Sequence, residues 1–438
     1  MSKYKIKVKD ILEYLIYFFP ISYILGNGII NFNLFLIFVF SLIFIFYYKK
    51  RIKFNPLLIA TLILGIFISS LSLFTSSETL KSVLFLRYPI FSILIYNIFL
   101  YIKFDIKKLI YFYTLIISII SFDIIFQYLF KFNLIGIKPF YAWKNFINYN
   151  SFFGNTKIAG SFLVNYLFFF IVGVSFFFKG NKYSNIIISL FILFVLIAIF
   201  ISQNRMSLVL ALFGLILFCS FYRGKVIVVL TSILSFLAFF YFFPENNIKI
   251  NYKNFLQNAT EINIKSKLFS KHLQGVEYKE IKKNIPKTHK TDSEFYHLIG
   301  SGHAQLFVSS LSIIKENFLM GVGIKNYSFA CNASKLKLKC SNHPHNYFLE
   351  ILATSGVISF IILILIIYLV LKDFLKSKIF LKPRLNLNEQ FYLILIINFI
   401  IIFFPFKSTG SFFTTGNASY IFFVIGLISY FQNIKYKK

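Results

Sequence analysis

The chain alternates between long apolar runs and short polar segments that are rich in lysine. An α-helix needs about 20 mostly apolar residues to cross the roughly 30 Å hydrocarbon core of a bilayer. Runs of about this length predict about twelve spans, near 11–26, 29–48, 56–74, 82–102, 109–129, 158–178, 184–202, 205–222, 225–243, 347–371, 389–406 and 418–432. We therefore expect an all-α integral membrane protein with a single polytopic domain over residues 1–438.

The composition supports a membrane protein. Of the 438 residues, 58% are hydrophobic and 14% are charged, whereas a soluble domain contains about 25% charged residues. The formal net charge of +31 would suggest nucleic acid binding in a soluble protein. Here the basic residues fall in clusters between apolar runs, which is how membrane proteins set their orientation. We expect membrane lipids, and no nucleic acid, as partners.

The basic clusters also predict the orientation of the spans. With the N-terminus inside, every cluster between closely spaced spans faces the cytoplasm, as the positive-inside rule requires. Both termini are then cytoplasmic, and the long segment 244–345 between the ninth and tenth spans lies outside. The apolar run after the lysine-rich start leads straight into another without a small-residue cleavage site, so we expect no cleavable signal peptide.

The long outer segment contains features of its own. Ser301 is suited to cap a helix over about 302–317, which would be amphipathic and would pack on the membrane surface or contribute to a site. Cys331 and Cys340 would face an oxidising compartment, so we predict a disulfide between them. Cys219, inside the eighth span, is expected to serve in packing.

Ionisable residues are costly inside spans and usually functional. On this reading of the spans they gather at the outer side: Arg87 in the fourth span, Asp123 in the fifth, Arg205 at the mouth of the eighth, His345 and Glu350 at the start of the tenth, and His303 in the outer segment. Taken singly, Arg87 and Asp123 can form a structural ion pair, and Arg205 can anchor a helix at the interface. Together they predict a polar site at the outer leaflet.

The stretch SNHPHNYFLE, residues 341–350, opens the tenth span. Pro344 fits the first helical position, which would place His345 in the first turn, where the helix dipole keeps the imidazole neutral. Asn346 would orient His345 or bind a sugar, and Glu350 would be its partner or an acid lining the helix. His343 is expected to support His345 or to cap the helix.

Metal ions and nucleotides are not expected here. The two histidines are two residues apart around a proline, and the chain contains no HExxH pattern, no GxxxxGK[ST] loop and no dinucleotide-binding fingerprint. We therefore predict no metal site, no cofactor and no direct use of ATP.

Several strings, in this order, resemble the O-antigen ligase and O-antigen polymerase superfamily of bacterial envelopes. They are FDIIFQYLF, FFGNTKIAGSF, SQNRMSLVLAL, GHAQLFVSSLSIIKENFLMGVGIKNY and HPHNYFLEILATSGVIS, and they cover most of the chain from about 120 to 360. The long outer segment between spans nine and ten is a further point of similarity. Each string alone is weakly specific, and it is their order that carries the resemblance.

The resemblance implies an inverting, metal-independent glycosyltransferase in the bacterial inner membrane, with its active site on the periplasmic side. It would transfer a glycan from an undecaprenyl-diphosphate carrier to an acceptor hydroxyl. Arg205 matches the family's arginine on the eighth span and would stabilise the diphosphate leaving group, assisted by Arg87. His345 matches the proposed general base. Where many members have arginine in an SGR context, this chain has His303 after Ser301 and Gly302, which puts a diphosphate clamp at that position in doubt.

Other functions remain open from the sequence. A ligase would use a lipid A core as the glycolipid acceptor, and a polymerase would use a second lipid-linked repeat; the span count and the place of the outer segment favour the ligase. A flippase or other transporter of lipid-linked oligosaccharide is the alternative of a different class. Transporters place their polar residues near the midplane and often show repeated halves, neither of which the sequence indicates.

Overall fold

A computed structural model describes residues 2–75, 79–102, 104–143, 146–257, 302–333, 340–382, 384–408 and 410–435. Within these ranges the protein is helical except for connections and one short antiparallel hairpin, formed by β1 (Phe140–Trp143) and β2 (Phe146–Asn148). Tyr141 lies opposite Ile147 in this hairpin. The all-α fold class predicted from the sequence is confirmed.

The first part of the chain forms long helices with short ones between them: α1 (Ser2–Tyr17), α2 (Phe19–Leu25), α3 (Asn27–Tyr47), α4 (Pro56–Thr75), α5 (Thr79–Val83), η1 (Leu84–Leu86), α6 (Arg87–Tyr101) and α7 (Ile106–Phe130). The single helix expected over 11–26 is wrong. The chain breaks at Phe18, and Pro20 then occupies the first turn of α2, where a missing N–H costs nothing.

The middle of the chain contains the hairpin and four long helices: η2 (Ser151–Phe153), α8 (Ala159–Phe177), α9 (Ser184–Ile201), α10 (Arg205–Phe221), η3 (Arg223–Lys225) and α11 (Val226–Phe242). A tight turn joins α9 to α10, as the sequence predicted. Gln203 adopts a left-handed backbone there, with φ 57°.

The last part begins with two helices of the long segment and ends with three long helices: α15 (Gly302–Glu316), α16 (Tyr327–Ala333), α17 (Tyr347–Ser377), η4 (Ile379–Leu381), α18 (Leu387–Ile402) and α19 (Thr415–Lys435). The helix expected over 302–317 is present as α15. Its Ile313 and Ile314 pack against Tyr327 and Ala353 of α16 and α17. This helix is therefore part of the folded protein and does not only cover the membrane surface.

Among the described residues, seven helices are long and apolar enough to cross a membrane, and an eighth is formed if α11 and the helix 247–257, bent by 112°, count as one broken span. Helices α10 and α18 are apolar but shorter. A multi-pass membrane protein is therefore supported, and the count of twelve spans stays a prediction.

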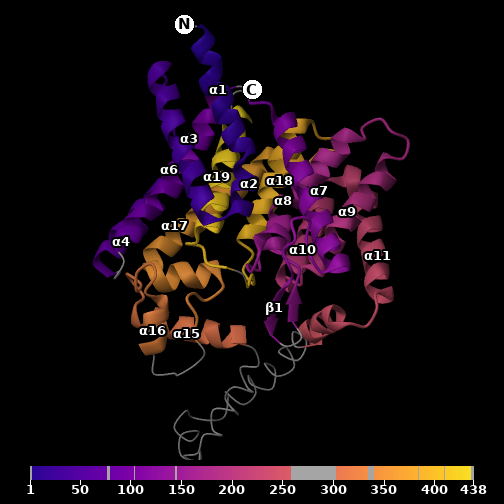
Figure 1. The fold of residues 1–438 in the computed structure, drawn as a ribbon. Helices are drawn as coiled ribbons and strands as arrows, with labels where there is room; N and C mark the ends of the chain where they lie inside the picture. Colours follow the sequence, from indigo (N-terminus) through magenta and orange to yellow (C-terminus); the bar gives the residue numbers. More distant parts are fainter. Residues whose placement is uncertain are drawn as a thin grey trace, which may run out of the picture.

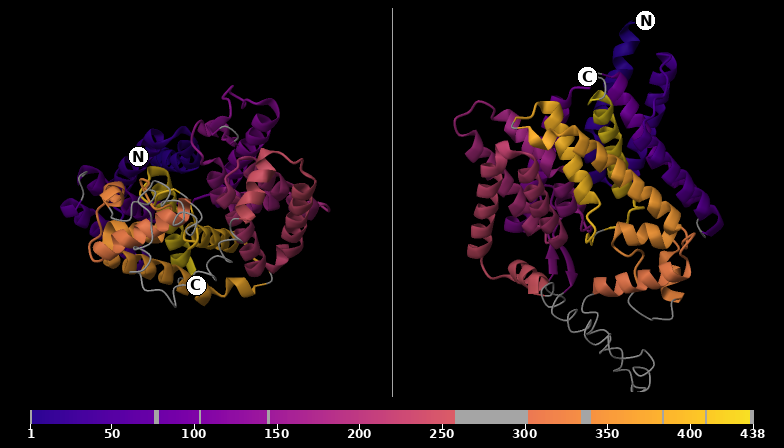
Figure 2. Two further views of the ribbon diagram at one scale, coloured as in Figure 1. Left: turned by 90° about the horizontal axis from the view of Figure 1, so that it is seen from below. Right: turned by 180° about the vertical axis from the view of Figure 1, so that it is seen from behind.

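The two ends of the helical bundle differ. The start of α1 and the end of α19 lie at one end, and the hairpin, α15 and α16 lie at the other (Figure 1). Both views of Figure 2 place the helices between Ser184 and Phe242 on the side of the bundle away from α15 and α16. Close packing of α6 on α19 ties the centre together, because a Cβ atom at Gly426 would lie 2.6 Å from the Ser92 carbonyl oxygen.

Helix α17 is broken near its start. Gly356 has φ 72° and ψ 179°, so the regular helical hydrogen bonds stop there. Three backbone groups are satisfied by the segment that follows α15: Val322 N donates to Ala353 O at 2.9 Å, Gly323 N donates to Thr354 O at 2.8 Å, and Val357 N donates to Phe318 O at 2.9 Å. Backbone groups freed in a membrane helix must find such partners. The outer segment is thereby joined to α17 by its backbone.

Candidate active site

The start of α17 differs from the prediction. Asn346 is the N-cap residue and α17 begins at Tyr347, so Pro344 is not the first helical residue and His345 is not in the first turn. Asn346 takes the N-cap position because its side chain accepts hydrogen bonds from the N–H groups of Phe348 and Leu349, both at 3.1 Å. A proline side chain cannot accept such bonds. His345 precedes the cap with φ 60°.

The two histidines lie against each other. Their ring centroids are 4.1 Å apart, and His343 Nε2 is buried without a hydrogen-bond partner in the described part of the chain. Burial, with the neighbouring His345 and Lys325, lowers the pKa of the His343 imidazole to about 4. His343 is therefore neutral at neutral pH, and it presents an uncharged ring to His345.

The Asn346 side chain also anchors a distant segment. Its amide donates to Pro405 O at 2.6 Å and to Lys407 O at 3.3 Å, in the connection between α18 and α19. With the two bonds at the cap, all four hydrogen-bonding positions of the amide are filled. Of the two roles expected for Asn346, this arrangement favours positioning of the neighbouring histidine over binding of a sugar.

Glu350 holds the same connection at a second point. Its side chain is 3% exposed, and its carboxylate accepts hydrogen bonds from the Ser411 hydroxyl and, at 2.6 Å, from Phe412 N. The carboxylate thus bonds to this connection rather than to a histidine. Asn346 and Glu350 together clamp residues 405–412, defined here as the α18–α19 connection, against the start of α17.

Arg87 reaches this region through aromatic packing. It is the first residue of α6, so it lies closer to the helix end than the sequence suggested. Its Nη2 donates to Tyr88 Oη at 2.6 Å, and the ring centroid of Phe85, two residues earlier, lies 6.0 Å from that of Phe412 in the α18–α19 connection. Its Nε atom is buried without a partner among the described residues.

The alternative ion pair between Arg87 and Asp123 does not form. Asp123 is fully buried and accepts hydrogen bonds from the Ser151 hydroxyl at 2.5 Å and from Leu134 N at 2.7 Å. These bonds tie the end of α7 to the chain on either side of the hairpin. Asp123 is a structural residue.

Arg205 belongs to a cluster of positive charge that is separate from the two histidines. It is the first residue of α10, and its guanidinium carbon lies 5.2 Å from the centroid of the Phe255 ring. Partial burial and the charge of Arg205 lower the pKa of Lys157, just before α8. Asn204 fixes the two segments to each other by donating to Lys157 O at 3.3 Å and Ser161 Oγ at 3.0 Å.

Glycine allows the two helices of this cluster to meet at their N-termini. A Cβ atom at Gly160 would lie 2.7 Å from both Asn204 Cβ and Ser202 Oγ. Neither α8 nor α10 carries an acidic residue in its first turn, so the positive dipole ends of two helices and two basic side chains lie together. Lys157 was not among the residues predicted for the site, although it lies within the FFGNTKIAGSF string.

His303 and the two cysteines of the outer segment complete the set of predicted residues. His303 lies in α15, but its side chain falls outside the described residues. A disulfide joins Cys331 in α16 to Cys340, with 5.7 Å between their Cα atoms, and Cys331 packs with Tyr327. The pairing predicted from the sequence is thus present just before His343. Among the described residues no group of three or more His, Cys, Asp or Glu side chains is placed to hold a metal ion.

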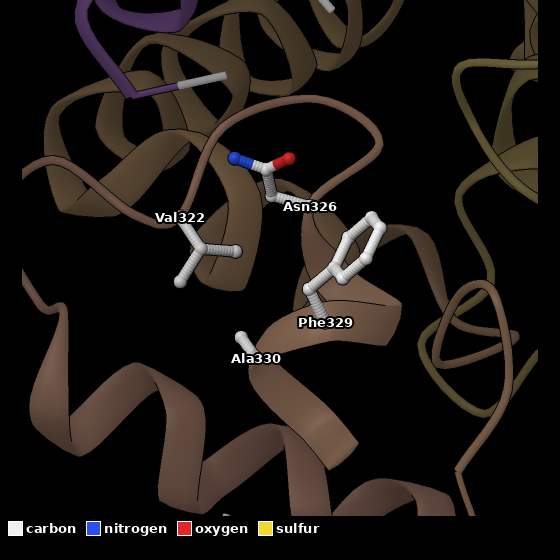
Figure 3. Close-up of a pocket in the computed structure, with 4 residues that line it drawn as sticks. All are labelled: Val322, Asn326, Phe329 and Ala330. Carbon is white, nitrogen blue, oxygen red and sulfur yellow. The ribbon is translucent and has the colours of Figure 1, made fainter. Parts of the chain in front are cut away.

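A hollow of about 340 Å³ beside α16 contains none of these predicted residues. Val322, Asn326, Phe329 and Ala330 line it, and Val322 and Ala330 face each other across it (Figure 3). The Asn326 amide donates to Thr75 O at 2.5 Å. The hollow is apolar and has no titratable group, so it does not form the reactive part of the site.

Comparison with protein families accounts for this arrangement. Residues 190–364 match the family model described as O-Antigen ligase. This match supports the resemblance of the chain to the O-antigen ligase and O-antigen polymerase superfamily. The matched residues run from α9 into α17 and include Arg205, the disulfide, both histidines, Asn346 and Glu350. The O-antigen ligase match therefore covers both clusters except for Lys157, Arg87 and the α18–α19 connection. No curated protein matches the chain.

Proposed function

We propose that the protein is a membrane glycosyltransferase of the O-antigen ligase type. It takes a glycan from an undecaprenyl-diphosphate carrier and joins it to a hydroxyl group of a lipid A core. The observation that supports this most directly is the placement of His345 beside a neutral His343, immediately before a capped helix whose start is fixed to the α18–α19 connection by Asn346 and Glu350. An imidazole in such a rigid setting is suited to remove a proton.

In the proposed reaction His345 accepts the proton of the acceptor hydroxyl as its oxygen attacks the anomeric carbon. The new C–O bond forms as the bond to the diphosphate oxygen breaks, and undecaprenyl diphosphate leaves from the opposite face with inversion. Proton, sugar and leaving group balance without a metal ion or a cofactor.

Negative charge grows on the diphosphate as the bond breaks, so fixed cations near it would stabilise the transition state. Arg205 and Lys157, with the N-termini of α8 and α10, supply such an environment. Arg87 and His303 are further candidates for substrate binding, and Glu350 supports the site through its hold on the α18–α19 connection.

The proposed location is the bacterial inner membrane, with both termini in the cytoplasm and the site on the periplasmic side. The arrangement of basic clusters in the sequence supports this orientation, as does the disulfide, which requires an oxidising compartment. The outer segment 244–345 contains α15 and α16, which lie at the end of the bundle away from the start of α1 (Figure 1).

The lipopolysaccharide of a deletion strain, separated on a gel, tests the proposal. A ligase predicts loss of all glycan-capped lipid A, restored by a plasmid copy of the gene. A band carrying a single repeat would show a polymerase that extends lipid-linked repeats, and accumulation of donor on the cytoplasmic face would show a flippase. Either result would overturn the ligase assignment.

A further inference from the structure

Lys407, in the α18–α19 connection, is a buried lysine whose charge has no anionic partner among the residues that the structure describes. Its side chain is 9% exposed, and its Nζ lies 4.9 Å from the centroid of the Tyr347 ring. In the described part of the chain this ring is the only partner of the ammonium group, because the recorded hydrogen bonds of Lys407 involve its backbone. A cation–π contact offsets only part of the cost of removing a charge from water.

A second buried lysine shows how this protein satisfies such a group. Lys249 is 6% exposed, and its Nζ donates to Tyr241 O at 2.8 Å and to Phe243 O at 2.7 Å. The Glu245 carboxylate lies 3.7 Å away. Within the described ranges Lys407 has no equivalent set of partners, so its positive charge is left available.

Glu350, the acid that holds the same connection, does not neutralise Lys407. The Glu350 carboxylate is taken by the Ser411 hydroxyl and Phe412 N. Burial alone lowers the pKa of the Lys407 ammonium to about 7, with no opposing charge contributing. An anion that enters the site would restore the charged form and supply the missing partner.

The position of Lys407 indicates which substrate would bring that anion. Its carbonyl oxygen accepts a hydrogen bond from Asn346, the residue after His345, so Lys407 lies on the side of the proposed base. In an inverting transfer the base and the acceptor lie on one face of the sugar and the leaving diphosphate lies on the other. The Arg205 and Lys157 cluster is a separate set of cations that suits the leaving group.

We propose that Lys407, packed against Tyr347 at the start of α17, is the cation of a phosphate-binding site for the acceptor, and that it binds a phosphate group of that glycolipid. This inference rests on the proposed function and deepens it. The Arg205 and Lys157 cluster then binds the donor at the N-termini of α8 and α10, and Lys407 binds the acceptor at the start of α17. Both acceptor classes considered above, a phosphorylated lipid A core and a lipid-linked repeat, carry phosphate.

Binding of ligands to the purified protein in detergent tests the Lys407 site without requiring glycan transfer. A failure of this proposal can therefore be told apart from a failure of the proposed transferase function. The probes are phosphorylated lipid A core, undecaprenyl diphosphate and, as a control for ordinary headgroups, phosphatidylglycerol. We expect Lys407→Met to weaken the binding of lipid A core roughly tenfold or more and Lys407→Arg to retain it. We also expect the protein to bind one undecaprenyl diphosphate, with an affinity that Lys407→Met does not change. Two bound undecaprenyl diphosphates, one of them lost in Lys407→Met, would support the same site in a polymerase.

Three results would overturn the proposal: unchanged binding of both substrate probes, loss of a single undecaprenyl diphosphate site, or an effect on phosphatidylglycerol alone. Lys382→Met is the control variant. Lys382 lies in the connection between α17 and α18, where it pairs with Glu389, and its replacement should leave the binding of all three probes unchanged.

Thermal unfolding without ligand separates a binding role from a structural one. Lys407→Met should raise the melting temperature, because it removes an unpaired buried charge. Lys249→Met, the matched buried lysine, should lower it, because its carbonyl partners lose their donor. A lower melting temperature for Lys407→Met would show that the lysine serves stability and would contradict the proposal.

Discussion

Gly356 and Leu319 are in contact through their backbones: a side-chain carbon at Gly356 would collide with the carbonyl oxygen of Leu319. This contact lies where α17 is broken and where residues 318–323 complete its hydrogen bonds. Gly321 makes a similarly close approach to Thr354. The outer segment and the helix that follows the candidate base therefore form one unit.

Gly356→Ala should destabilise the protein by more than its backbone conformation alone explains. A left-handed non-glycine residue costs about 1–2 kcal/mol, and the collision with Leu319 adds to this. Gly136→Ala is the matched control, since Gly136 also has a positive φ but open space around its Cβ position. Thermal unfolding in detergent should show a larger fall for Gly356→Ala, and equal falls would contradict the contact.

Replacement of His345 should abolish glycan transfer while the protein still inserts and binds the donor. Asparagine is the best test residue, because it tolerates the left-handed backbone that His345 adopts and lacks a basic imidazole. Transfer in membranes and undecaprenyl diphosphate binding are measured for His345→Asn and His345→Ala. Transfer retained in His345→Asn would remove histidine from the role of base.

Asn346 should matter for more than its helix cap. Asn346→Ala loses the cap, about 1 kcal/mol, and leaves the Pro405 and Lys407 carbonyls without their donor, about 1–3 kcal/mol for each such buried group. Asn346→Asp keeps the cap, loses the donors and places a carboxylate oxygen against the two carbonyls. We expect both variants to be less stable in thermal unfolding than Asn386→Ala, which removes the cap of α18 alone. Similar melting temperatures for Asn386→Ala and Asn346→Asp would argue against the anchor.

Arg205→Ala should raise the KM for the lipid-linked donor roughly 10- to 100-fold, because a charged contact to the diphosphate is lost. Lys157→Ala should have a smaller effect in the same direction, because Lys157 is exposed and its charge is screened by solvent. Arg384→Ala, an exposed arginine between α17 and α18, controls for general loss of positive charge. An unchanged donor KM in Arg205→Ala would exclude Arg205 from the donor site.

Stability should fall on acidification because of His343. Its folded pKa of about 4 is below the ordinary 6.5, so the unfolded chain binds more protons between these values and the free energy of unfolding decreases as the pH falls through this window. His343→Asn should make the decrease in melting temperature between about pH 6.5 and pH 4 shallower. An identical pH dependence in the variant would show that His343 is not buried in its neutral form.

Much of the fold could be predicted from the sequence because it follows from local properties. The length of an apolar run decides whether a helix can cross a bilayer, and α15 and the turn at Gln203 follow from residues close together in the chain. The break at Phe18 was missed because the run from 11 to 26 is mostly apolar and predicts one helix, although Pro20 in the first turn of α2 marks where it divides.

The candidate site was predicted in part. The histidine pair, Arg205 and the disulfide could be found because each lies in a short polar stretch beside an apolar run. Lys157 and Lys407 could not, since lysine is common in this chain and nothing local distinguishes them from the lysines that set orientation. Their significance depends on Arg205 in one case and on burial against Tyr347 in the other.

The sequence by itself determined that this is a helical membrane protein and where its polar residues concentrate, because hydrophobicity and charge act over a few turns of chain. Only the tertiary structure decided what those residues do. Asn346 became an anchor and Glu350 a clamp because a connection about sixty residues later folds back onto the start of α17, and a buried polar group must take its partners from whatever packing brings within reach.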